Sequence, residues 1–289
     1  MINRKTFNEL VSEDYILLPG VYDCLSAKMA EKVGFKAVFF SGGAYSMANM
    51  GLPDIGFYNP SELINQLVKI RNFIDIPIIC DIDNGFGNSI HASYICRTLE
   101  SIGVNGVQID DQILPQNLPT LGKEKMDINL LLPKLISIRN EVSKNFTIIF
   151  RTISNITSGL DEAIYRINSV SNLIDYAYVD GLKSIDEIEK VAKNSKVKLL
   201  INMNEKSIAS NLEINYLKKL GYKIGLYPVS AFSIAANSIK NVYETIINEG
   251  NTLKIRSNMY DILDLYSEMK LNEKVMRNIK YYEVNKNEE

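Results

Sequence analysis

Eight short runs of β-branched and aromatic residues alternate with longer amphipathic stretches, and this alternation constrains the fold more than any other feature. The runs fall at 15–20, 37–42, 76–83, 106–111, 146–151, 176–181, 197–204 and 223–228. Strands that alternate with helices are typical of a parallel sheet covered by helices. Eight such units predict an α/β protein of the (β/α)8 barrel type. An open doubly wound sheet is the alternative, because a single sequence does not show whether a sheet closes.

Helical patterns between these runs predict helices at 25–34, 61–73, 92–103, 131–142, 160–170, 185–194 and 213–221. Several of them end at glycine, the usual stop signal. A further region from Ala231 to about Met276 has the apolar spacing of two or three more helices. No linker divides the 289 residues. We therefore expect residues 1–289 to form a single barrel domain with a C-terminal helical extension from about residue 231.

The composition excludes several classes of function. The 32 basic and 34 acidic residues give no basic footprint for nucleic acid. No apolar stretch approaches the ~20 residues that span a bilayer, and the N-terminus lacks a signal-peptide pattern. Three cysteines and one histidine argue against a disulfide framework and a His/Cys zinc site. No phosphate-binding glycine motif follows the first run. We expect a cytoplasmic protein with a small-molecule partner.

Polar residues stand at the C-terminal edge of almost every predicted strand, which is where barrels carry their chemistry. Each of these residues is one that packing alone would not select. We therefore expect them to form one site. They are Ser41, Gly42, Gly43, Asp81, Asp83, Asp110, Asp111, Arg151, Asp180, Asn202, Asn204, Tyr227 and Pro228.

Three aspartates in this set suggest a metal ion. Asp81 and Asp83 are two apart on a strand and share one face, and Asp110 ends the next strand. Three converging carboxylates repel one another unless a cation lies between them. Oxygen ligands without histidine favour a hard ion such as Mg²⁺, which keeps several waters. The alternative is that these aspartates cap the helices that follow.

Arg151 and the Ser41-Gly42-Gly43 segment suggest an anionic ligand. A guanidinium at the mouth of a barrel can clamp a carboxylate or phosphate with two hydrogen bonds. Its alternative role is an ion pair that holds the aspartates in place. The Ser-Gly-Gly segment offers accessible backbone N–H groups, although a tight turn would require the same residues.

Several motifs occur in the order found in one enzyme family. PGVYDCLSAKMAEKVGFKAVFFSGG, GLPDIG, CDIDNGFGN and QIDDQ are followed by FRT, GLDEAIYR, NMNE and GYKIGLYPVSAF. From about residue 7 to residue 266 the chain resembles the isocitrate lyase/phosphoenolpyruvate mutase superfamily. The resemblance implies a Mg²⁺-dependent barrel, with Mn²⁺ as a substitute ion. It also implies a last helix exchanged between subunits in a homotetramer that is a dimer of dimers.

The resemblance also implies roles for individual residues. The metal ligands would be Asp81, Asp83 and Asp110, the last standing where the family usually has glutamate. The substrate would contact Ser41, Gly42, Gly43, Arg151, Asp180 and Asn202, and the catalytic residues would be Asp54, Arg151 and Asn117.

The loop after the fourth strand departs from the family's lyases. It reads DQILPQNLPTLGKE and lacks the cysteine that supplies a proton during carbon-carbon cleavage. Asn117 is a partial echo of the phosphonomutase loop, while oxaloacetate decarboxylase-like members also lack the cysteine.

We expect a Mg²⁺-dependent carbon-carbon lyase that acts through a pyruvate enolate on a small 2-oxo or 2-hydroxy di- or tricarboxylate. Phosphorus-carbon chemistry on a phosphonate substrate is the first alternative. A barrel that binds a metabolite without catalysis is the second.

Overall fold

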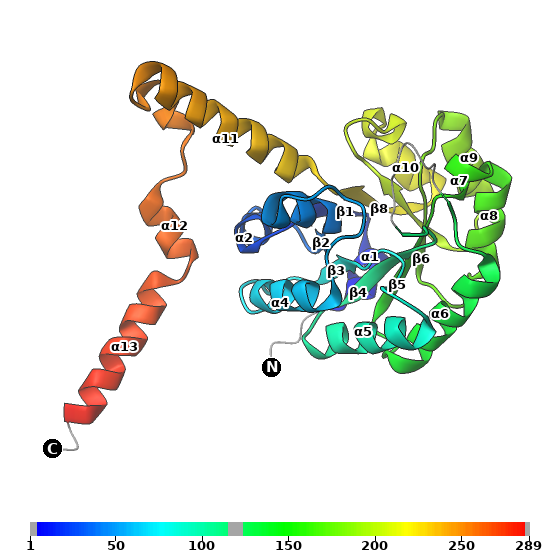
Figure 1. Cartoon of the computed structure of the whole chain (residues 1–289), viewed down its shortest axis with the longest axis horizontal. Helices are drawn as coiled ribbons and strands as arrows, with labels where there is room; N and C mark the ends of the chain where they lie inside the picture. The colour runs from blue at the N-terminus through cyan, green and yellow to red at the C-terminus, as the bar shows by residue number, and fades with distance from the viewer. Residues whose placement is uncertain (1–4, 115–123, 287–289) are drawn as a thin grey trace. The chain divides into compact units, whose positions relative to one another are not determined.

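The chain folds into a closed barrel of eight parallel strands that follow one another in sequence order (Figure 1). The computed structural model describes residues 5–114 and 124–286. Strand β8 pairs with β1 and closes the barrel. The (β/α)8 class and all eight predicted strands are confirmed. The strands are β1 (Ile16–Val21), β2 (Val38–Phe40), β3 (Ile78–Asp81), β4 (Gly106–Asp110), β5 (Thr147–Thr152), β6 (Tyr176–Val179), β7 (Lys198–Asn202) and β8 (Tyr222–Tyr227).

Helices follow the strands and cover the outside of the barrel (Figure 1). Many begin at a polar residue whose side chain accepts backbone N–H groups of the first turn, as Asn59 does for α4. All seven helices predicted between the strands are confirmed. In chain order they are α2 (Cys24–Lys32), α4 (Pro60–Arg71), α5 (Ser89–Ser101), α6 (Ile128–Glu141), α8 (Leu160–Ser169), α9 (Ile185–Asn194) and α10 (Ile214–Leu220); shorter elements are α3 (Gly42–Tyr45), η1 (Ser46–Met50), α7 (Ser154–Thr157) and η2 (Ile208–Asn211).

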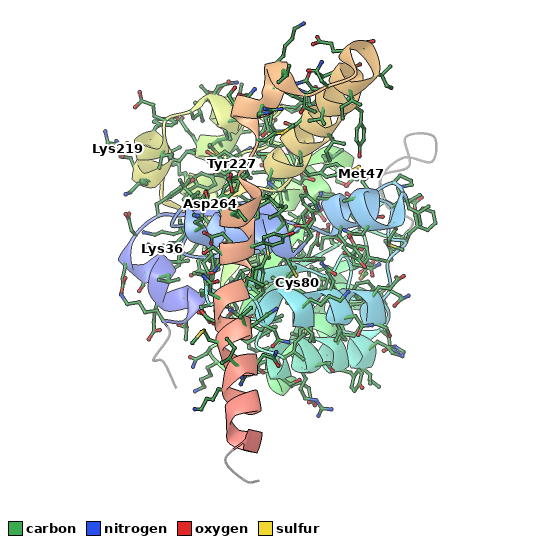
Figure 2. All side chains as sticks on the ribbon, turned by 90° about the vertical axis from the view of Figure 1, so that its left-hand side faces the viewer. Lys36, Met47, Cys80, Lys219, Tyr227 and Asp264 are labelled. Atoms are coloured by element: carbon green, nitrogen blue, oxygen red, sulfur yellow. The ribbon has the colours of Figure 1, made fainter. Side chains whose placement is uncertain are left out.

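Two apolar cores hold the barrel together. The larger one lies between the strands and the surrounding helices and includes Cys80, which is labelled in Figure 2 and is fully buried. The other fills the barrel interior, so the barrel is packed rather than hollow. Cys80 therefore packs as a small apolar residue.

Helix α1 (Phe7–Glu13) closes the N-terminal end of the barrel. It begins at a capping box in which Thr6 and Glu9 satisfy each other's backbone N–H groups. Phe7 is fully buried in the interior core and packs edge-to-face on Tyr176, with ring centroids 6.1 Å apart. Helix α1 thus covers one end of the interior core, and the strands terminate at the other end.

The chain divides into two compact units, Met1–Ile234 and Ala235–Glu289. The second holds most of α11 (Ser230–Glu249), then η3 (Leu253–Asn258), α12 (Ile262–Glu268) and α13 (Leu271–Lys286). These are the helices predicted after the last strand. The single-domain organisation stays a prediction. No described helix has the length and apolar character needed to cross a membrane.

The second unit buries none of the side chains that the structure describes in it. Its apolar residues are instead exposed, among them Ile247 at 82% and Leu263 at 71%. Figure 2 draws these side chains, and its label Asp264 shows the position of α12. Apolar side chains exposed in such numbers are typical of surfaces that another chain covers.

Candidate active site

Six polar side chains surround the C-terminal mouth of the barrel. Alternate residues of a strand face the same side, and the interior core contains Phe39, Ile79, Ile149 and Leu200. The residue two positions beyond each of these is polar and faces the same interior space. The same alternation holds on β4 and β6. The residues brought together in this way are Ser41, Asp81, Asp110, Arg151, Asp180 and Asn202.

Arg151 lies between two carboxylates at this mouth. Its Nη2 is 2.7 Å from Asp180 Oδ2 and its Nη1 is 3.8 Å from Asp110 Oδ2. The guanidinium also stacks over the Tyr178 ring at 5.5 Å from the centroid. Its Nε is buried and donates to no acceptor within the described part of the chain. Arg151 is thus held between the two carboxylates by ion pairs.

Asp180 is held by a short chain of hydrogen bonds. The Tyr178 hydroxyl donates to Asp180 Oδ1 at 2.9 Å, and Asn202 Nδ2 donates to that hydroxyl at 2.7 Å. The backbone N–H of Gly181 donates to the same carboxylate oxygen at 2.9 Å. A pocket of about 230 Å³ adjoins this chain and is lined by Asp180, Asn202 and Lys206 among others. Asn202 therefore orients Asp180 through Tyr178.

Asp81, Asp83 and Asp110 meet where β3 and β4 end. The Asp83 N–H donates to Asp81 Oδ1 at 3.2 Å, and the Asp110 N–H donates to the Asp83 carbonyl at 2.8 Å. Removal from water, and then the charge of Asp83, raise the pKa of Asp81 well above its usual value. Burial also raises the pKa of Asp110. A cation at this point would stabilise the ionised carboxylates.

Asp83 adopts a backbone conformation that most residues avoid. Its φ angle is 46°, in the left-handed region that aspartate tolerates better than most other side chains. The next turn is braced by Lys134, a buried residue of α6 whose Nζ donates to the carbonyl of Asn84 at 2.8 Å. Unusual backbone geometry that is held in this way is concentrated at functional sites.

The carboxylates at this point do not by themselves form a complete ligand set for a metal ion. Within the described residues, no group of three or more His, Cys, Asp or Glu side chains is arranged to hold one. Gln112 donates to both oxygens of Asp110, from its backbone N–H at 3.0 Å and its side-chain amide at 2.8 Å. Asp81 and Asp83 with Asp110 acting through water would suit Mg²⁺, which keeps several waters. The metal site stays a prediction.

Close packing explains the two glycines that follow Ser41. A Cβ on Gly42 would lie 2.3 Å from the Tyr58 hydroxyl oxygen, and a Cβ on Gly43 would lie 2.6 Å from Asp54 Oδ2. Any side chain at either position would collide with these groups. The structure therefore places the predicted Asp54 beside the predicted Ser-Gly-Gly segment.

Tyr58 lies at the same edge, although no motif marked it. It is only 2% exposed. An aromatic residue in a loop usually signals core packing, and the sequence gives no sign that its hydroxyl lies against Gly42. Only the Asp54–Tyr58 spacing, four residues within one loop, could have suggested it.

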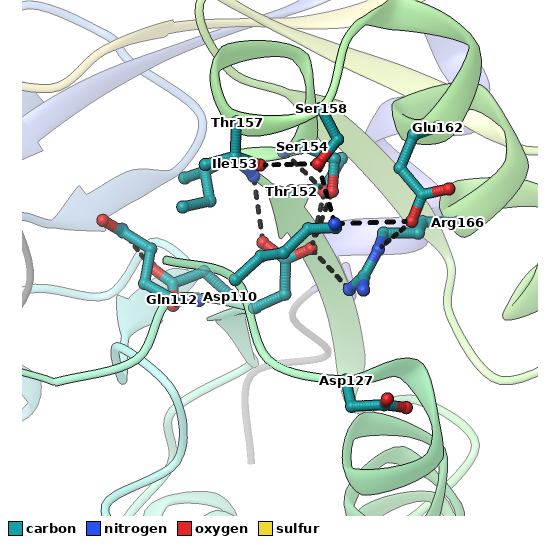
Figure 3. A network of polar contacts seen from close by, with 12 residues as sticks. Asp110, Gln112, Asp127, Thr152, Ile153, Ser154, Thr157, Ser158, Glu162 and Arg166 are labelled. Carbon is teal, nitrogen blue, oxygen red and sulfur yellow. Dashed lines mark hydrogen bonds and ion pairs between the residues drawn. The ribbon is translucent and has the colours of Figure 1, made fainter. Parts of the chain in front are cut away.

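A second polar network lies in the wall of the barrel, on the outer side of β4 (Figure 3). Asp111 is fully buried and accepts hydrogen bonds from the Thr152 hydroxyl at 2.6 Å and the Ile153 N–H at 2.9 Å. Arg166 of α8 donates to it at 3.1 Å and to Glu162 at 2.9 Å. This network ties β4 and β5 to α8 and leaves the Asp111 carboxylate no part in the site.

The loop after β4 is joined at its base by an isolated antiparallel bridge between Gln112 and Lys125. Lys125 Nζ donates to the Ser158 hydroxyl at 2.8 Å and lies 3.8 Å from a Glu162 oxygen. The base of the loop is thereby fixed to the wall network. Asn117, predicted to be catalytic, lies outside the described residues, and its role stays a prediction.

A family model described as phosphoenolpyruvate phosphomutase matches residues 7–247, well over half of the chain. The chain belongs to the isocitrate lyase/phosphoenolpyruvate mutase superfamily. Among its relatives in this superfamily, 2-methylisocitrate lyase of Halalkalibacterium halodurans is 31% identical over 84% of this chain and 82% of that protein. The 2,3-dimethylmalate lyase of Eubacterium barkeri is 26% identical over 86% of this chain and 88% of that protein.

Solved structures of the superfamily show the same fold. Oxaloacetate acetylhydrolase in complex with 3,3-difluorooxalacetate matches with a TM-score of 0.88, at 22% identity over 96% of each chain. Phosphonopyruvate hydrolase in complex with oxalate and Mg²⁺ matches with a TM-score of 0.82, at 22% identity over 93% of this chain and 94% of that chain. The family resemblance seen in the sequence is confirmed.

Proposed function

We propose that this protein is a Mg²⁺-dependent carbon-carbon lyase that cleaves a small 2-oxo or 2-hydroxy di- or tricarboxylate through a pyruvate enolate. The observation that carries the proposal is the position of Arg151. It is fixed between Asp110 and Asp180, it interacts electrostatically with Asp81, and its buried Nε faces no acceptor within the described residues. The names of the relatives, 2-methylisocitrate lyase and 2,3-dimethylmalate lyase, support the same class of reaction.

Some residues at the mouth would bind the substrate, and others would orient the residues that bind it. Arg151 would hold a substrate carboxylate, because a guanidinium matches the geometry of a carboxylate. Ser41, Gly42 and Gly43 would provide N–H donors for an oxygen of the pyruvate unit. Asp180, positioned by Tyr178 and Asn202, would keep Arg151 in the orientation needed.

Asp81 and Asp83, with Asp110 through water, would hold the metal ion. A bound Mg²⁺ would supply positive charge to offset the negative charge that develops on the two pyruvate oxygens. Phosphonopyruvate hydrolase, whose structure contains Mg²⁺ and oxalate, supports this assignment by analogy. The buried positions of the Asp110 carboxylate and the Arg151 Nε limit contact with bulk water, which strengthens electrostatic stabilisation.

Phosphorus-carbon chemistry is the alternative that a specific observation favours. Asp54 Oδ2 lies against Gly43, where it could act as a nucleophile or an orienting group toward a phosphoryl centre. In that case Asn117 would correspond to the phosphonomutase asparagine. A phosphonate substrate would then replace the carboxylate.

The exposed apolar residues of the second unit support a homo-oligomer. The helices α11 to α13 expose Ile247, Leu263 and Met276, at 82%, 71% and 63%. We propose that other copies of the chain cover these residues in a dimer of dimers whose last helix is exchanged. A monomer would leave this apolar surface in water.

Pyruvate release, measured by a coupled assay with and without Mg²⁺, tests the proposed reaction. The panel contains oxaloacetate, methylisocitrate, dimethylmalate and phosphonopyruvate. Metal-dependent release from one of the phosphorus-free acids is the expected result. Release from phosphonopyruvate alone would indicate hydrolysis of a phosphorus-carbon bond, and conversion of phosphonopyruvate to phosphoenolpyruvate without pyruvate release would indicate a mutase. Binding without turnover of any of these acids would indicate a non-catalytic barrel.

A further inference from the structure

The hydroxyl of Tyr58 is a buried polar group that the described residues leave unsatisfied. The side chain is 2% exposed, and its oxygen has no hydrogen-bond partner within the part of the chain that the structure describes. A buried hydroxyl without a partner costs about 1–3 kcal/mol, so nearly all such groups in folded proteins are paired. A partner from outside the described residues would explain why this position carries tyrosine rather than phenylalanine.

The ring of Tyr58 is fixed by its neighbours. It packs edge-to-face on Tyr45 and on Phe86, with centroid separations of 6.2 and 5.6 Å. This packing directs the hydroxyl to the α-carbon of Gly42, where a methyl group would lie 2.3 Å from the oxygen. Because the ring is held in this way, the hydroxyl occupies one defined position at the edge of the site.

The surroundings of this hydroxyl make it a donor. Burial, followed by the charges of Asp83 and Asp81, raises the pKa of Tyr58 well above its ordinary value, so the phenol stays protonated. Ionised carboxylates are acceptors only, whereas a neutral phenol adds a donor to the site without adding charge. Tyr58 therefore offers the ligand a neutral donor at the point where Gly42 and Gly43 meet Tyr58 and Asp54.

We infer that Tyr58 is a substrate-binding residue whose hydroxyl donates a hydrogen bond to a carboxylate or enolate oxygen of the ligand beside Gly42. The inference rests on the proposed function, because it takes the ligand to be a small 2-oxo or 2-hydroxy acid. It assigns specificity to a loop residue that neither the metal site nor Arg151 accounts for. Ligands that lack an oxygen at this position will bind more weakly.

The test compares Tyr58→Phe with Tyr15→Phe. Both replacements remove one buried tyrosine hydroxyl that has no partner among the described residues, and Tyr15 precedes β1, away from the mouth of the barrel. Both variants should keep the native Tm or exceed it, because each removes an unsatisfied polar group. The two therefore form a matched pair that differs in location.

Calorimetric titration with Mg²⁺ alone, followed by titration with oxalate in saturating Mg²⁺, gives the readout. We expect Tyr58→Phe to bind Mg²⁺ as the native protein does and to bind oxalate about 10- to 100-fold more weakly, as expected for losing a hydrogen bond to a charged group. Tyr15→Phe should match the native protein in both titrations.

Three outcomes would overturn the inference in different ways. Equal oxalate affinity in native protein and Tyr58→Phe would remove Tyr58 from the ligand site and leave the proposed function intact. Weaker Mg²⁺ binding in Tyr58→Phe would assign the hydroxyl to the cation rather than to the substrate. Absence of oxalate binding by the native protein would overturn the proposed function itself, and the inference with it.

Discussion

Asp110 and Asp111 are neighbours in the sequence, but their carboxylates lie on opposite sides of the barrel wall. Asp110 faces the interior, where it receives two hydrogen bonds from Gln112 and lies 3.8 Å from Arg151. Asp111 points outward and pairs with Arg166 at 3.1 Å. The Asp110 carboxylate therefore belongs to the candidate site, whereas the Asp111 carboxylate stabilises the fold.

Replacing the outer carboxylate should cost stability. Asp111→Ala would leave the buried Arg166 guanidinium with only one of its two carboxylate partners, Glu162, and breaking a buried pair lowers the free energy of unfolding by about 3–5 kcal/mol. Urea denaturation followed by circular dichroism measures this loss.

Asp110→Asn is the matched variant on the inner side. It should lose Mg²⁺-dependent pyruvate release and lower the unfolding midpoint in urea less than Asp111→Ala does, because it weakens hydrogen bonds from Gln112 and leaves the buried Arg166 pair intact. If Asp110→Asn were the less stable of the two variants, the assignment of the two carboxylates would be reversed.

Asp81→Ala should abolish Mg²⁺-dependent activity without unfolding the protein. Asp81 ends β3 at the mouth of the barrel and supports no described helix cap, so its loss removes a carboxylate and one hydrogen bond, from the Asp83 N–H, but no helix or strand. Pyruvate release and the Tm are the measurements. Asp186→Ala, which removes an exposed carboxylate of α9, is the control. Full activity of Asp81→Ala in the presence of EDTA would contradict the metal assignment.

Phe7→Ala should destabilise the barrel from its closed end. The ring is fully buried on Tyr176, and deletion of a buried phenylalanine costs about 3–5 kcal/mol. Phe57, half exposed, is the control, because Phe57→Ala removes the same ring with little loss of burial. Similar unfolding midpoints for the two variants in urea would show that α1 contributes little to the barrel.

Charges on the exposed apolar face of the second unit should weaken self-association. In the double variant Ile247→Asp with Leu263→Asp, a carboxylate would enter each contact with another copy. Sedimentation velocity should show a smaller particle than the native protein. Asn241→Asp, which adds charge to α11 without removing an apolar group, should leave the particle size unchanged. A native protein that sediments as a monomer would contradict the proposed assembly.

The alternation of strands and helices was predictable because buried parallel strands need continuous apolar runs and their covering helices need one apolar face. The residues at which the strands end were less predictable. Asp83 was expected to end the third strand, yet β3 stops at Asp81 because the φ angle of Asp83 is positive. The capping box of Thr6 and Glu9 was visible as a T-x-x-E pattern but was not used to predict α1.

The separation of Asp110 from Asp111 could not be read with certainty from sequence, since it depends on which face of β4 meets the interior. Similarly, the contact between Tyr58 and Gly42 could not be predicted, because the two residues lie in different segments that the fold brings together. Local patterns identify polar strand ends, whereas contacts between loops depend on three-dimensional packing.

The bridge between Gln112 and Lys125 makes the loop after β4 a replaceable module. Both ends of that loop are anchored to the barrel. Lys125 donates a hydrogen bond to the Ser158 hydroxyl, and the Gln112 side chain donates one to the Asp110 carboxylate. Segments of other lengths and sequences could therefore be grafted between the two anchors while the aspartates and Arg151 keep their positions. A scaffold of this kind allows new chemistry to be explored by exchanging one loop.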